Sequence, residues 1–147
     1  MDGSGGPRDL ADAVYAGDLP TVEALIAAGV DVNAVADGLF SPPLDDAIEH
    51  GRVAIARRLI AAGADVNFAN RGGQTVLFHA IDVESDWVGQ RGVPTDAAST
   101  ELTEMLLAAG AVPTPQAIEL ARVYGNRRAL SLLERARHAD PGTAVGG

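Results

Sequence analysis

Two nearly identical nine-residue stretches constrain the fold of this chain most. Residues 25–33 read LIAAGVDVN and residues 59–67 read LIAAGADVN, so the copies differ only where Ala64 replaces Val30. Equivalent positions lie 34 residues apart. A period in the low thirties that joins helix-like runs to a glycine-containing turn is typical of repeat proteins, in which each unit packs on its neighbours. We therefore expect a stack of similar units rather than one shared core.

Three segments have the pattern of an amphipathic helix that ends at a glycine. In residues 53–63, VAIARRLIAAG, apolar side chains recur at helical spacing, and Gly63 supplies the left-handed position that ends the helix. Residues 21–29, TVEALIAAG, and residues 99–110, STELTEMLLAAG, repeat this pattern, the latter with Ser99 or Thr100 as the expected N-cap. Helices this short cannot bury their apolar faces alone, so we expect them to stack in pairs.

These stretches resemble the motif of the ankyrin repeat family. That motif runs from Thr-Pro-Leu-His-x-Ala-Ala through a glycine and a second helix to Gly-Ala-Asp-Val-Asn. Residues 75–81 (TVLFHAI), 42–48 (PPLDDAI) and 63–67 (GADVN) match it in large part. The resemblance implies an all-α solenoid of about four stacked helix-turn-helix repeats, two capping and two inner. The implied repeats cover residues 9–34, 35–68, 69–112 and 113–137, with disordered tails at 1–8 and 138–147.

The third repeat departs from the family pattern in its length. Gly63 and Gly110 are 47 residues apart rather than 34, which adds about 13 residues. The stretch at 84–97, ESDWVGQRGVPTDA, is polar and contains Gly and Pro, so we expect an inserted loop between the two helices. It holds the only tryptophan, Trp87. The motif histidine is also missing, because its positions hold Ala11, Asp45, Phe78 and Glu119.

The resemblance implies that the chain binds another protein in a concave groove formed by the first helices and the turn tips. Side chains just before each repeat glycine and at the turn tips would face this groove, and Trp87 would reach it from the inserted loop. Aromatic side chains and arginine among acidic neighbours are typical of a recognition surface. The predicted partner-binding residues are Tyr15, Phe40, Glu49, His50, Arg71, Asp82, Val83, Trp87 and Tyr124.

A second hypothesis assigns chemistry to the same face. Asp12, Asp46 and His79 occupy one motif position in three successive repeats, so stacked helices would set them in a row. Asp46 and His79 could form an acid/base pair in a small-molecule binder or atypical enzyme, with a pocket beneath the Trp87 loop. A ladder of polar side chains that satisfy turn amides is the commoner outcome. The pattern identifies no reaction and favours a binding module without catalysis.

Charge is distributed unevenly along this acidic chain, whose net charge is −9. Residues 1–50 hold ten acidic side chains and one basic, whereas residues 51–147 hold ten of each. Nucleic-acid binding requires clustered basic residues, so we expect no such partner. The acidic first repeat and the arginine-rich segment at 125–140 suggest a third hypothesis, which is weak head-to-tail self-association.

The remaining features exclude several classes of site. The chain has no cysteine, which excludes disulfides and thiolate metal sites. His50, His79 and His138 share no ligand spacing, and no phosphate loop or dinucleotide fingerprint occurs, so we expect neither a metal nor a cofactor. Apolar runs are far shorter than the ~20 residues that cross a membrane, and residues 1–10 contain no leader pattern. We expect a cytoplasmic protein.

Overall fold

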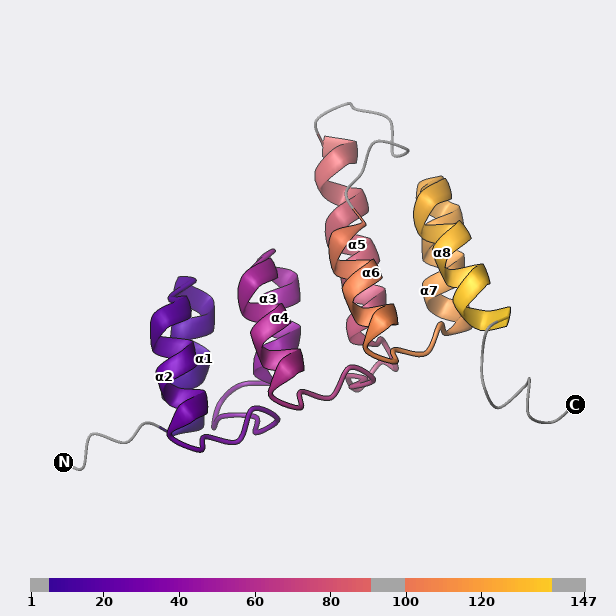
Figure 1. The fold of residues 1–147 in the computed structure, drawn as a ribbon. Coiled ribbons are helices and arrows are strands. Elements are labelled where there is room, and N and C mark those ends of the chain that lie inside the picture. Colours follow the sequence, from indigo (N-terminus) through magenta and orange to yellow (C-terminus); the bar gives the residue numbers. More distant parts are fainter. Residues whose placement is uncertain (1–5, 91–99, 139–147) are drawn as a thin grey trace, which may run out of the picture.

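A computed structural model describes residues 6–90 and 100–138 of the chain. These residues form eight α-helices and no strand, apart from one isolated antiparallel bridge between Ala69 and Thr75 (Figure 1). The helices are α1 (Pro7–Ala16), α2 (Leu19–Ala27), α3 (Pro43–Glu49), α4 (Val53–Ala61), α5 (Val76–Gln90), α6 (Glu101–Ala108), α7 (Pro115–Tyr124) and α8 (Arg127–His138).

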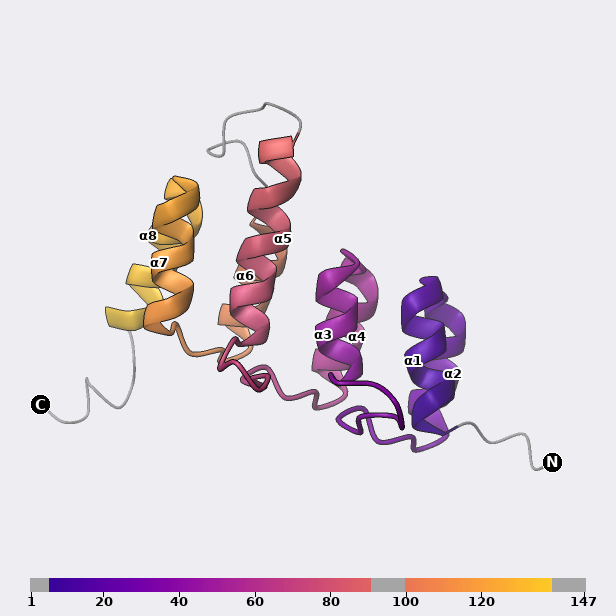
Figure 2. The ribbon, with the colours of Figure 1, turned by 180° about the vertical axis from the view of Figure 1, so that it is seen from behind.

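The helices pair in chain order, and the four pairs stand side by side in a row (Figures 1 and 2). The first helices α1, α3, α5 and α7 pack on one another in one layer, and the second helices α2, α4, α6 and α8 form the other layer. The leucines at equivalent positions of the first three repeats are all buried in the apolar core that runs along the row: Leu10, Leu44 and Leu77. The predicted all-α solenoid is therefore confirmed.

The repeated Gly-x-Asp-Val-Asn turn joins the first repeat to the second and the second to the third through its asparagine. Asn33 Nδ2 donates to the carbonyl of Gly63 at 3.1 Å, and Asn33 Oδ1 accepts from the amide of Asp65 at 2.7 Å. Asn67 repeats both bonds one unit later, to the carbonyl of Gly110 (3.3 Å) and from the amide of Val112 (2.8 Å). The turn recurs in the sequence because the same contact between repeats recurs in the structure.

Glycine ends the first helix in three of the four repeats. Gly17, Gly51 and Gly125 follow α1, α3 and α7 with φ values of 75°, 66° and 68°, which side chains rarely adopt. In the third repeat this position is occupied by Glu84. It lies seven residues after Leu77, just as Gly51 lies seven residues after the equivalent Leu44. No residue there needs a left-handed backbone, and α5 continues to Gln90.

The predicted loop at 84–97 is therefore wrong for residues 84–90, which belong to α5. Their polar composition concealed a helix because Glu84 is buried against α6 and Ser85, which is also buried, contacts Asn126 of the fourth repeat. Residues 91–97 lie outside the described ranges. In Figure 1, α5 extends beyond the ends of the other helices.

The predicted tails also need correction at their inner ends. Helix α1 begins at Pro7, whose fixed φ suits a first helical position, so residues 7 and 8 belong to the helix. Helix α8 includes His138. The remaining tail residues lie outside the described ranges, apart from Gly6, which is the N-cap of α1.

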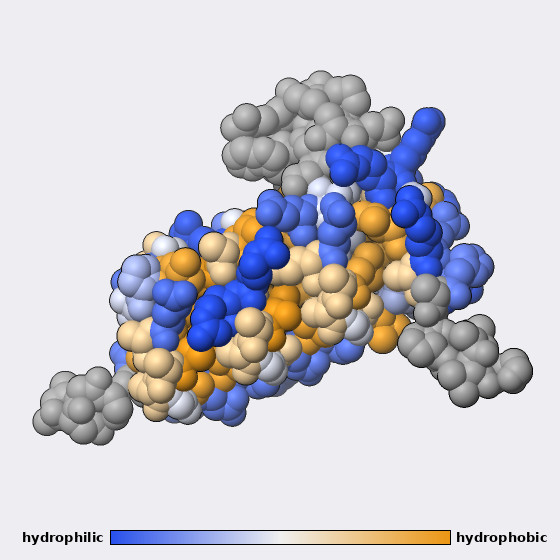
Figure 3. Space-filling view, viewed as in Figure 1, coloured by the Kyte–Doolittle hydropathy of each residue, from blue (hydrophilic) through white to orange (hydrophobic). Residues whose placement is uncertain are grey.

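The second-helix face mixes apolar and charged areas. Figure 3 shows apolar residues over the middle of the row and hydrophilic residues over much of α8. Within the described ranges, no helix has both the length and the apolar character needed to cross a membrane.

Candidate partner-binding site

The face made by α1, α3, α5, α7 and the turns that precede them, here named the groove face, carries most of the predicted site residues. Tyr15 and Phe40 are 67% and 85% exposed. Glu49, His50 and Arg71 are also exposed, whereas Asp82, Val83 and Tyr124 are partly buried. The side chain of Trp87 lies outside the description, although its backbone is helical, so its predicted role stays a prediction.

Successive first helices contact one another through a repeated pair of positions. The rings of Tyr15 and His50 meet edge to face with centroids 5.0 Å apart, and Tyr124 Oη donates to Asp82 Oδ1 at 2.7 Å. In both pairs the earlier residue is two before the repeat-glycine position and its partner is one before that position. Neighbouring first helices are thus offset by one residue. A side chain contacts the residue that lies one position after its own equivalent in the next repeat.

The same offset decides which acid contacts His79. Nδ1 of His79 lies 2.5 Å from Oδ1 of Asp45, a side chain that is only 3% exposed. Hydrogen bonding to Asp45 raises the pKa of His79, and the negative charges of Glu49 and Asp82 act in the same direction, while burial opposes them. In the sequence, Asp45 was identified only as a departure from the family motif. Asp45 lies one residue before Asp46, the equivalent of His79, and with the one-residue offset this position predicts the contact between Asp45 and His79.

The predicted row of Asp12, Asp46 and His79 does not form a unit. Asp12 is exposed and lies 3.6 Å from Arg8 within α1. Asp46 accepts a hydrogen bond from Ser41 Oγ at 3.1 Å, and burial is the main cause that raises its pKa. The carboxylates that His79 contacts are those of Asp45 and Glu49, because neighbouring first helices are offset by one residue.

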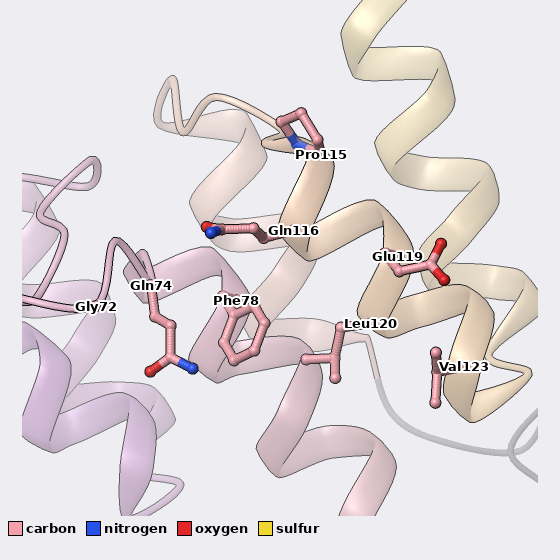
Figure 4. A pocket seen from close by; sticks show the side chains of 8 residues that line it. All are labelled: Gly72, Gln74, Phe78, Pro115, Gln116, Glu119, Leu120 and Val123. Atoms are coloured by element: carbon pink, nitrogen blue, oxygen red, sulfur yellow. The ribbon is translucent and has the colours of Figure 1, made fainter.

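An open recess of 510 Å³ lies on the groove face between α5, α7 and the turn before α5. Phe78 and Leu120 supply its apolar wall, with Val123 at one end (Figure 4). Gln74 and Gln116 place amide groups around the opening. Phe78 and Leu120 were missed as site residues, since their partly buried positions read as core in a helical pattern. The remaining lining residues are Gly72, Pro115 and Glu119.

Glu84 anchors the second helix of the third repeat. Its carboxylate accepts from the amide of Leu102 at 2.9 Å and from Thr103, through the amide at 3.3 Å and the hydroxyl at 2.7 Å. The expected cap Thr100 occupies the N-cap of α6 but makes no side-chain cap bond. Glu84 therefore caps α6 from the neighbouring helix. Burial raises the pKa of Glu84 to about 7, although these hydrogen bonds act in the opposite direction.

The carboxylates on this face lie in a partly desolvated environment. Burial also raises the pKa of Glu49, and the charge of Asp45 adds to the effect. The acids Asp45, Asp46, Glu49 and Asp82 belong to two adjacent first helices, α3 and α5. A cationic group brought to this part of the groove face would lower the repulsion among them.

Comparison with known proteins agrees with this architecture. The family model described as ankyrin repeats (3 copies) matches residues 10–90, which is more than half of the 147 residues. No curated protein matches the chain. The matched region includes the first helices that carry Tyr15, Glu49 and His79. The chain belongs to the ankyrin repeat family.

Proposed function

We propose that this chain is a protein-interaction module whose groove face binds a cationic segment of another protein that carries one large apolar side chain. Ankyrin repeats are in general protein–protein interaction modules. The observation that carries the finer proposal is the 510 Å³ recess beside Phe78 and Leu120, because it is open on the groove face and large enough for such a side chain.

The recess suits an anchor residue of the partner. An apolar side chain placed there would cover Leu120 and Val123 and release water from both surfaces. Gln74 and Gln116 would then hydrogen-bond to the partner's backbone at the rim. This division between an apolar centre and a polar rim is typical of protein interfaces.

Charge favours a basic segment around that anchor. Glu49 and Asp82 lie on the helix before the recess and on the helix that lines it, and the net charge of the chain is −9. Opposite charge on the partner would speed association and would do so less at high salt. Tyr15 and Phe40, which are exposed farther along the row, offer additional apolar contacts.

Peptide display on the immobilised full chain tests this proposal. We expect selected peptides to combine an aromatic or long aliphatic residue with flanking Lys or Arg. Fluorescence anisotropy should then show that Leu120→Glu weakens binding by about 30-fold, as expected for a central anchor contact. Leu130→Glu is the matched control, because Leu130 is also partly buried against the core but lies on α8.

Two outcomes would reject the proposal. Equal affinity of the wild type and Leu120→Glu for the selected peptides would exclude the recess, and enrichment of acidic peptides would exclude the charge assignment. The hypothesis of an Asp46–His79 catalytic pair receives no support from the geometry, since Asp45 holds His79 instead. Head-to-tail self-association stays a prediction, which sedimentation at low and high ionic strength tests directly.

A further inference from the structure

Three potential metal ligands from two repeats converge on the groove face. Asp45 and Glu49 belong to α3 and His79 belongs to α5. One donor atom of each lies within 4.8 Å of the others. Nδ1 of His79 is 2.5 Å from Oδ1 of Asp45 and 4.0 Å from Oε1 of Glu49, so one nitrogen faces both carboxylates.

Local structure explains why these groups meet. Asp45 and Glu49 are four residues apart in α3, which places them on one face of that helix. Helix α5 packs against α3 and brings His79 to this face. Asp45 is held in position by burial, at 3% exposure, whereas Glu49 is 48% exposed and has room to move.

The distances are close to those that a tetrahedral ion requires. Ligand bonds of about 2.0–2.2 Å in a tetrahedral zinc site place donor atoms about 3.3 Å apart. The Asp45–His79 contact would have to lengthen, and the Glu49–His79 distance would have to shorten, each by less than about 1 Å. The exposed Glu49 side chain can make the second adjustment without a change in the backbone.

The donor set and the charge select the kind of cation. One imidazole nitrogen with two carboxylates suits zinc and neighbouring transition metals, whereas magnesium and calcium prefer oxygen ligands alone. Asp46 and Asp82 add negative charge around the three ligands. A divalent cation would balance the two ligating carboxylates, which is more than the single charge of a protonated histidine achieves.

We propose that Asp45, Glu49 and His79 bind one Zn²⁺ ion, with water in the fourth position. Binding forms bonds from Nδ1 and from one oxygen of each carboxylate to the metal, and the proton on Nδ1 leaves to solvent. Metal motifs in sequence depend on fixed short spacings, and this set is divided between two repeats, which is why His79 shows no ligand spacing to the other histidines.

The test uses the full chain freed of metal with EDTA and titrated with Zn²⁺ by calorimetry and with Co²⁺ by visible absorption. We expect one ion per chain and Co²⁺ bands typical of low coordination. Asp45→Asn, Glu49→Gln and His79→Ala should each weaken binding at least ~10-fold, since even the loss of a group that hydrogen-bonds to a metal ligand costs that much. Asp46→Asn and His50→Ala are matched controls on the same helical segment and should change binding less than about 3-fold, because neither side chain is a ligand and charges near the surface interact weakly.

Glu49→Gln is decisive because it leaves the buried Asp45–His79 pair intact and Glu49 is half exposed, so the variant should stay folded by circular dichroism. Reduced affinity in Glu49→Gln with unchanged affinity in Asp46→Asn would support the site. Equal loss in both variants would show attraction to the acidic surface alone and overturn the proposal. Absence of saturable one-to-one binding would also overturn it.

Discussion

Replacing Glu84 by glutamine should remove a pH dependence from the folding stability of the chain. In the folded protein burial raises the pKa of this carboxyl to about 7, from an ordinary value of 4.5. Between pH 4.5 and pH 7, Glu84 holds a proton in the folded state that it has lost in the unfolded state. The stability contributed by protonation is therefore complete below pH 4.5 and is lost as the pH rises through 7.

The size of the effect follows from the two pKa values. At about 1.4 kcal/mol for each pKa unit, the difference corresponds to about 3 kcal/mol. The glutamine variant has no proton to exchange at this site, while its amide oxygen can still accept a hydrogen bond from α6. The stability of the wild type relative to Glu84→Gln should thus fall by more than about 2 kcal/mol between pH 5 and pH 8.

Urea denaturation followed by circular dichroism at several pH values measures this difference. The series should begin at pH 5, because the sequence pI is about 4.6 and the uncharged chain would aggregate. His79, whose pKa is also raised, is present in both proteins, so its contribution cancels in the comparison. A stability difference that stays constant from pH 5 to pH 8 would refute the assignment of a buried, proton-binding Glu84.

Three further substitutions test contacts within and between repeats. Asn67→Ala removes both side-chain bonds to the third repeat and should lower the free energy of unfolding by about 1–2 kcal/mol, seen as a lower urea midpoint. Gly51→Ala places a side chain at φ 66° and should cost about 1 kcal/mol in the same assay, although no atom obstructs the new methyl group. Tyr124→Phe loses the hydrogen bond to Asp82 and should cost about 1 kcal/mol, with unchanged helix content; no loss of stability would mean that this bond contributes nothing.

The architecture could be predicted from the sequence because the relevant signals are local and repeated. Most of the helices have apolar side chains at helical spacing and a glycine just after their last turn, and the copied turn indicates that one contact recurs between repeats. Asn126, which directly precedes α8, is a residue type that favours N-caps, and it accepts from the amide of Ala129 at 3.0 Å. Such features depend on residues within a few positions of one another, so they can be read without coordinates.

Tertiary structure decided which side chains meet across repeats. Asp45 contacts His79 rather than its own equivalent because stacked helices are offset by one residue, a displacement that no single repeat encodes. Residues 84–90 continue α5, and the carboxylate of Glu84 is buried against the start of α6. The recess beside Leu120 likewise exists only when α5 and α7 lie together. These features depend on distances between separate helices, and sequence periodicity carries no information about such distances.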